Sequence, residues 1–259
     1  METIAGIFDS RREAERAVQG LHSAGIPNDR IAFLAPGKSD SRAESVPHTD
    51  TEAPGMGPAM GGAVGGALGA AGGATLGAAA ASLLIPGVGP VIAGGVIGAA
   101  LLGAGGAATG AAAGAALEKE LAVGMSHDEL FVYEDALRNG RSVVIAFVED
   151  EDQKELVYNV LAQANAESID AARESWWLGL RDAEEEYYVG QGGDFGADEV
   201  SYRRGFEAAL NTKRRGVPYS EASRELSDSF ADERQGEAFR QGYARGQNYH
   251  QTLREKYKS

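Results

Sequence analysis

The chain has 259 residues, no cysteine and a formal net charge of −14 at neutral pH. Without cysteine it can form no disulfide, thiolate metal ligand or thiol nucleophile. The acidic excess argues against binding of nucleic acid, whose phosphate backbone attracts basic surfaces. Hydrophobic residues make up 43% of the chain, but many of them are alanine, so the core that it can bury is smaller than the length suggests.

The first elements along the chain are predicted to be a strand, a helix and a second strand. Residues 3–8 have a strand pattern, and Asp9 or Ser10 can then cap a helix. Gly25 ends that helix, and a Pro-Asn-Asp turn leads into a strand at residues 31–34. The helix carries one apolar stripe, formed by Ala14, Ala17, Val18 and Leu21. Together these elements make a β-α-β unit.

An uncharged segment rich in glycine and alanine follows at residues 56–117. Its glycines recur at four-residue spacing in two runs, separated by the turn sequence Pro86-Gly87-Val88-Gly89-Pro90. Residues four apart lie on one ridge of an α-helix, and glycine on that ridge lets a second backbone approach closely. The pattern predicts a glycine-zipper helical hairpin that packs through Gly57, Gly61, Gly65, Gly69, Gly73, Gly77, Gly94, Gly98, Gly106, Gly110 and Gly114.

Each half of this hairpin, at residues 61–85 and 91–117, is long enough to span a hydrocarbon core of about 30 Å. Lys38, Arg42 and Lys119 flank it, which places both termini in the cytoplasm if the hairpin spans the cytoplasmic membrane. A four-residue ridge winds around a straight helix, so one partner cannot cover it, and we expect a homo-oligomer in the lipid bilayer. The alternatives are a soluble cytoplasmic protein whose hairpin packs internally or between subunits, and a disordered linker.

Strand and helix patterns return after the insertion. Ser126 and Glu129 form a capping box for a helix that ends at about Arg138, before Asn139-Gly140. A strand at residues 141–148, a helix at 151–164 and a short strand at 167–169 follow. With the first β-α-β unit, this order is typical of a ferredoxin-like split βαβ fold.

The sequence thus predicts an α+β protein with an interrupted domain. Residues 1–37 and 118–170 form the two halves of a ferredoxin-like domain, 38–55 a polar linker and 56–117 the zipper hairpin. Residues 171–259 form a helical C-terminal extension, whose protein partner the sequence does not identify.

The extension contains a loose repeat of an aromatic residue, two further residues, glycine and a large apolar residue. The copies are Trp176-Trp177-Leu178-Gly179-Leu180, Tyr202-Arg203-Arg204-Gly205-Phe206 and Phe239-Arg240-Gln241-Gly242-Tyr243. We predict short helices that cross closely at these glycines while the aromatic rings fill the gaps. Base stacking on the aromatic and arginine side chains is the alternative, but acidic residues flank every copy.

Candidate active sites are not supported. Gly37-Lys38-Ser39 resembles the end of a P-loop, but Ala32 stands where the first glycine belongs. Asp9 is interpreted as a helix cap, and Glu184-Glu185-Glu186 as a solvated helix face. The histidines show no metal-ligand spacing; they are His22, His48, His127 and His250. We predict no catalytic residue, cofactor or metal site.

The chain resembles the bacterial general-stress or heat-induced stress proteins (YflT-like), in which a glycine-zipper segment splits a ferredoxin-like domain. The resemblance covers about residues 3–170, with Ser126 where a proline is common in the family. It implies a stress-associated bacterial protein, often described as a membrane protein, with no established biochemical activity and no catalytic residue to transfer. It rests on residues 4–8 with the helix at 13–21, on Pro86 to Pro90, and on Gly124, Tyr133-Glu134, Leu137 and Gly140.

The function expected is that of a non-enzymatic structural or interaction protein, tethered to the membrane by its self-associating hairpin. The alternatives are a soluble structural oligomer and a regulatory domain that senses a small ligand.

Overall fold

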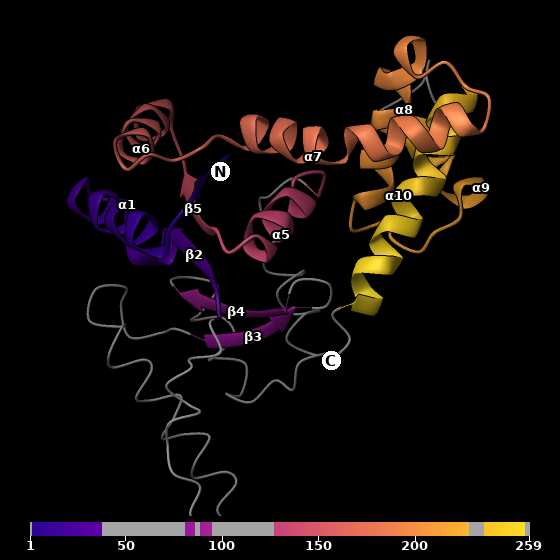
Figure 1. The fold of residues 1–259 in the computed structure, drawn as a ribbon. Coiled ribbons are helices and arrows are strands. Elements are labelled where there is room, and N and C mark those ends of the chain that lie inside the picture. The colour runs from indigo at the N-terminus through magenta and orange to yellow at the C-terminus, as the bar shows by residue number, and fades with distance from the viewer. Residues whose placement is uncertain (1, 38–80, 86–88, 95–126, 228–235, 257–259) are drawn as a thin grey trace, which may run out of the picture. The chain divides into compact units, whose positions relative to one another are not determined.

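The computed structural model describes residues 2–37, 81–85, 89–94, 127–227 and 236–256 (Figure 1). The fold is mixed α+β and divides into two compact units. We call residues 1–124 and 136–168 the sheet unit, and residues 125–135 and 169–259 the helical unit. Each is described by itself below.

The sheet unit is built on five antiparallel strands in the order β1-β5-β2-β4-β3. The strands are β1 (Glu2–Phe8), β2 (Ile31–Pro36), β3 (Ala81–Ile85), β4 (Gly89–Gly94) and β5 (Ser142–Val148). Because β5 pairs antiparallel with both β1 and β2, these two outer strands run parallel to each other. The helix between them therefore makes a crossover connection that passes over β5.

Both helices of this unit begin at capped N-termini. In α1 (Arg11–Ser23) the Ser10 hydroxyl accepts a hydrogen bond from the backbone N–H of Glu13 at 3.3 Å, so Ser10 is the cap. Asp9, the other predicted cap, forms an ion pair with Arg141 at 2.9 Å instead. In α6 (Glu151–Gln163) the Asp150 carboxylate takes the same role. Each cap satisfies an N–H that the first helical turn leaves without a partner.

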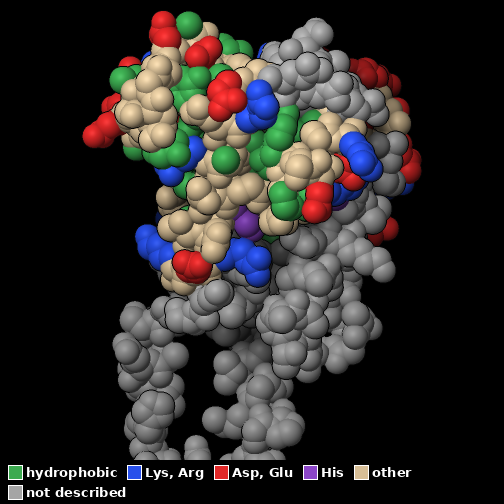
Figure 2. Space-filling view, turned by 90° about the vertical axis from the view of Figure 1, so that its right-hand side faces the viewer, with side chains coloured by type: hydrophobic (Ala, Val, Ile, Leu, Met, Phe, Trp, Pro, Cys, Tyr) green, Lys and Arg blue, Asp and Glu red, His purple; other side chains and the backbone are tan. Residues whose placement is uncertain are grey.

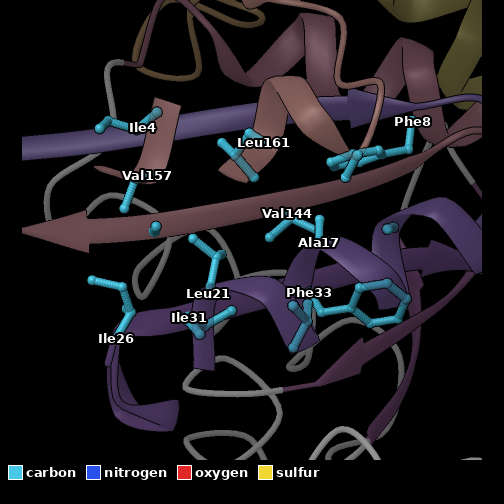
Figure 3. Close-up of a cluster of buried hydrophobic side chains, with 14 of the residues drawn as sticks. Ile4, Phe8, Ala17, Leu21, Ile26, Ile31, Phe33, Val144, Val157 and Leu161 are labelled. Atoms are coloured by element: carbon cyan, nitrogen blue, oxygen red, sulfur yellow. The ribbon is translucent and has the colours of Figure 1, made fainter. Parts of the chain in front are cut away.

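The core of the sheet unit lies between the two helices and one face of the sheet (Figure 3). Alternate strand residues point into it, because successive side chains of a strand face opposite sides. Many of the intervening strand residues are buried as well, and all seven positions of β5 are buried. The predicted stripe on α1 is confirmed as part of this core, whose labelled members include Ile4, Phe8, Ala17, Leu21, Phe33, Val144, Val157 and Leu161.

One predicted element after the insertion differs from the structure in extent, and one predicted helix end is confirmed. The strand expected at residues 167–169 is a single bridge, in which Ile7 and Glu167 exchange backbone hydrogen bonds of 2.8 and 3.0 Å. It stops there because Ile169 already begins helix α7 (Ile169–Gly190). Helix α5 (Leu130–Arg138) ends at Arg138 as predicted, and Gly140 beyond it has a φ of 81°, which suits glycine. Ser126 of the predicted capping box lies outside the described residues.

The zipper hairpin was predicted to be helical, and this is wrong wherever the structure describes it. Residues 81–85 and 89–94 are the strands β3 and β4, which pair with Leu83 opposite Val91. Gly94 stands at the end of β4 opposite Phe33, not on a helix ridge. The remaining zipper glycines lie outside the described residues.

The physical reason is partly local and partly the pairing with β2. The most aliphatic part of the insertion flanks a Pro-Gly sequence of the kind that favours turns, and short apolar runs on both sides of such a sequence are a hairpin signal. Glycine costs a helix interior about 1 kcal/mol relative to alanine, whereas β2 offers β4 a row of backbone hydrogen bonds. Across the described ranges, none of the helices combines the length and the apolar character needed to cross a bilayer.

The helical unit contains α7 followed by α8 (Phe195–Leu210), the short α9 (Tyr219–Ala222) and α10 (Glu237–Lys256). Single 3-10 turns occur at Asn28–Arg30 in the sheet unit and at Glu225–Ser227 here. Helices α8 and α10 pack along each other more extensively than any other described pair. Their crossing, visible in Figure 1, organises the unit.

Candidate functional site

The crossing of α8 and α10 is made by two copies of the aromatic-glycine repeat. A β-carbon on Gly242 would lie 2.8 Å from the carbonyl carbon of Tyr202, and nearer still to its oxygen. A β-carbon on Gly205 would stand in the same relation to Phe239. Each glycine thus faces the carbonyl of the first aromatic residue of the other copy. The predicted close crossing is confirmed for these two copies, whereas a β-carbon on Gly179, in the copy at residues 176–180, would meet nothing within 4 Å.

Aromatic side chains surround this crossing, as predicted. Trp176 lies 5.8 Å from Phe206 between ring centroids, and Trp177 lies 6.0 Å from the same ring. Both pairs are edge-on, which is a favoured arrangement of aromatic quadrupoles. Trp177, Tyr202, Phe206, Phe239 and Tyr243 are fully buried. The repeat is therefore a packing device.

Glu184 is a buried carboxylate at the centre of the unit, and its interpretation as part of a solvated face is wrong. Its side chain is 5% exposed and forms two hydrogen bonds with Arg245, at 2.6 and 3.0 Å. It also accepts one from the Tyr202 hydroxyl at 2.7 Å. Burial and this carboxylate together raise the pKa of Tyr202. The Arg245 guanidinium also lies 4.2 Å from the Tyr187 ring centroid.

A second paired carboxylate, Glu199, connects α8 to α7. Arg181 donates to both of its oxygens at 2.9 Å, and the Trp177 indole N–H donates at the same distance. The hydrogen bond from Arg181 lowers the pKa of the Glu199 carboxyl, against the opposing effect of burial. Nearby, burial and a hydrogen bond to Asp198 raise the pKa of Tyr188 to about 12.

This pairing predicts an acid-sensitive contribution to stability. A carboxyl whose pKa is lower in the folded state stabilises the fold above its unfolded pKa of about 4.3, and the contribution is lost as the pH falls through the folded value. Replacing Glu199 with glutamine should therefore lower the free energy of unfolding of the helical unit at pH 7. The difference between the variant and the wild type should become smaller below about pH 4. Urea unfolding at both pH values, followed by tryptophan fluorescence, measures this. Glu186→Gln, an exposed position on α7, is the control and should show no such narrowing.

A groove of about 430 Å³ runs beside the C-terminal half of α10. Gln247 lines the groove and is fixed by two hydrogen bonds: its side-chain amide donates to the carbonyl of Arg214 at 2.7 Å and accepts from the Gly216 N–H at the same distance. The ionic side chains that line the groove are Arg254 and Glu255, which have opposite charges. On the face shown in Figure 2, basic and acidic side chains are likewise interspersed. The groove therefore has no clear charge preference.

The other residues considered from sequence are not brought together. His22 contacts Asn28 at 3.2 Å, and the Nδ1 of His127 lies 2.6 Å from the Thr212 hydroxyl. His48 and most of the P-loop-like sequence lie outside the described residues. Within the described ranges, no three His, Asp or Glu side chains are close enough to hold a metal ion.

The edge of the sheet is a candidate assembly surface. β3 is the last strand and, among the described strands, has β4 as its one neighbour. Its sequence, Ala-Ser-Leu-Leu-Ile, contains no charge and no proline. Natural proteins usually protect an exposed edge with charges, prolines or bulges. The sequence analysis missed this edge because it assigned the segment to a helix, although the Pro-Gly turn between aliphatic runs was a signal for it.

Comparison with models of protein families, with curated proteins and with solved structures finds no match to the chain.

Proposed function

We propose that the protein is a non-enzymatic interaction protein that associates with itself through the outer edge of β3, which has β4 as its one neighbour among the described strands. The observation that carries this proposal is the uncharged edge strand at the end of a five-stranded sheet. The unpaired N–H and C=O groups of such a strand favour pairing with another strand. A second copy of β3, related by a twofold axis, presents the same groups in antiparallel order.

The geometry of a closed dimer follows from the register of the hairpin. Leu83 is the middle residue of β3 and stands opposite Val91. A twofold axis at Leu83 would pair β3 with its copy over all five residues and join two sheets into one. The opposite edge is less available, because Glu167 already bonds to Ile7 of β1. Assembly through β3 would thus give a dimer and not a filament.

The ferredoxin-like fold and the stress-protein family belong to the same proposal. Counting the bridge at Glu167 as a short strand, the order Glu167-β1-β5-β2 is that of a split βαβ fold, with β4 and β3 added beyond β2. Under this proposal the glycine-rich insertion supplies the assembly strand, in place of a membrane hairpin. The resemblance to stress proteins implies that the assembly acts under stress.

The test is the oligomeric state of the full chain. We expect sedimentation velocity to show a concentration-dependent dimer, and we expect Leu83→Lys to shift it to monomer because two lysines would face each other across the axis. Tyr158→Lys adds the same charge at an exposed position on α6 and should leave the dimer unchanged.

Hydrogen exchange adds a measurement that does not depend on a variant. In an edge strand only alternate amides bond to the neighbouring strand. The other amides of β3 should become protected as the protein concentration rises, while those of β5 are protected throughout. A chain that stays monomeric at high concentration, or that associates only in detergent or lipid, would contradict the proposal.

A further inference from the structure

In the helical unit, Asp128 lies just before α5 and contacts two arginines, Arg173 of α7 through its backbone carbonyl and Arg214 of the loop after α8 through its carboxylate. Arg173 donates through Nη2 to the carbonyl oxygen of Asp128 at 3.3 Å. The Nη1 of Arg214 lies 3.9 Å from Oδ1 of Asp128, and Asn211 donates to the same oxygen at 2.6 Å. The neighbouring Arg215 binds Glu134 through two hydrogen bonds of 2.7 and 2.8 Å. Among the described residues, Asp128 is the one carboxylate paired with Arg214, and Arg173 is paired with none.

Three N–H donors of these arginines are buried without an acceptor. They are the Nε of Arg173 and the Nε and Nη1 of Arg214, none of which has a hydrogen-bond partner in the described part of the chain. The Arg214 side chain is 11% exposed. Buried donors are almost always satisfied, and a buried guanidinium without acceptors carries a large desolvation penalty. Arg215, next in the chain, has acceptors for its Nε and for both terminal nitrogens.

The Arg214 position is fixed by the backbone. Its carbonyl accepts hydrogen bonds from the Gln247 amide at 2.7 Å and from the backbone of Val217 at 3.0 Å. Its N–H donates to the carbonyl of Asn211 at 2.8 Å. These bonds fix the main chain from which the Arg214 side chain extends, and burial of that side chain restricts its guanidinium. Such preorganisation lowers the entropic cost of binding a ligand.

We propose that Arg173 and Arg214 bind a phosphate-type oxyanion beside Asp128. The two arginines and Asp128 leave one net positive charge, and the unfilled positions are all donors, so the ligand must be an acceptor and an anion. Phosphate oxygens suit guanidinium donors in geometry and charge. Access is from the side of Asp128, whose side chain is 62% exposed. Asp128 competes with the ligand for Arg214, so it sets the affinity.

The test uses the full chain and inorganic phosphate, followed by calorimetric titration and by the thermal midpoint of the tryptophan signal. We expect saturable binding that sodium chloride at the same ionic strength does not reproduce. Arg214→Gln should weaken binding by about ten- to a hundredfold, because it removes charged donors. Lys213→Gln removes the same charge from an exposed position in the same loop and should change little.

The direction in which Asp128→Asn changes phosphate affinity is the decisive result. This variant keeps an acceptor for Asn211 but removes the competing charge, so phosphate should bind several-fold more tightly. If Arg214→Gln fails to fold, Arg173→Gln tests the second arginine of the site in the same way.

The affinity for phenyl phosphate, compared with that for inorganic phosphate, shows whether the site prefers a phosphomonoester or free phosphate. Equal responses of the Lys213 and Arg214 variants, or weaker binding by Asp128→Asn, would overturn the proposal.

Discussion

Gly242→Ala should unfold the helical unit at a much lower urea concentration than the wild type. A methyl group at Gly242 would lie 2.8 Å from a backbone carbonyl carbon on α8, and a backbone cannot rotate away as a side chain can. Overpacking in a close-packed interior costs about 1–3 kcal/mol, and occasionally more. Because the clash is with main chain, we expect about 3 kcal/mol or more. Urea unfolding by tryptophan fluorescence reports this unit, since both tryptophans lie on α7.

The copy of the repeat at residues 176–180, on α7, supplies the matched control. Gly179 is also helical and holds the same position in its copy of the repeat, but a β-carbon there would meet nothing within 4 Å. Alanine has the higher helix propensity, so Gly179→Ala should be neutral or should stabilise α7 by up to about 1 kcal/mol. Similar losses of stability at Gly179 and Gly242 would mean that helix propensity, and not the crossing, explains the effect.

Arg245→Met is expected to have the second large effect. It removes the cation that faces Glu184 and leaves a buried carboxylate that, within the described residues, keeps one hydrogen bond, from the Tyr202 hydroxyl at 2.7 Å. Removing one member of a buried ion pair costs about 3–5 kcal/mol, because the other charge stays desolvated. Methionine keeps most of the apolar length of arginine, so little of the loss comes from packing. The measurement is again the free energy of unfolding in urea.

The same helix offers an exposed pair for comparison. Arg240 lies 3.4 Å from Glu237, and its side chain is 49% exposed. Exposed ion pairs contribute about 0–1 kcal/mol, so Arg240→Met should change stability little. Adding Glu184→Gln to Arg245→Met should recover part of the loss, because no uncompensated charge remains. A large effect at Arg240, or no recovery in the double variant, would contradict this account of Glu184.

Local patterns predicted most of the sheet unit. The stripe on α1, the cap at Ser10 and the strand around Val144 depend on residues close in sequence, and all three are confirmed. The helix prediction for the insertion was wrong where the structure describes it, because a four-residue glycine period is compatible with a helix but does not require one. β4 is stabilised by pairing with β2, and that partner cannot be read from the insertion itself.

The helical unit shows the same limit at longer range. Its aromatic-glycine repeat predicted a close crossing, but nothing local distinguished Gly179 from Gly205 and Gly242. The paired carboxylates were not predicted either, since Glu184 and Arg245 are 61 residues apart. A charged residue on a helix is solvated unless a distant element covers it, and the three adjacent glutamates gave no sign of which one α10 would bury.

The position of β5 in the sheet has a consequence for synthesis. β1 pairs along its whole length with β5, and Phe8 stands opposite Ser142. The partner of β1 is therefore translated about 130 residues later, which at roughly 5–20 residues per second is a delay on the order of ten seconds. Until β5 is synthesised, the strand that lies between β1 and β2 is missing. A ribosome-bound chain shorter than this would present two apolar strands to the chaperones at the exit tunnel, and the sheet could close only after β5 emerges.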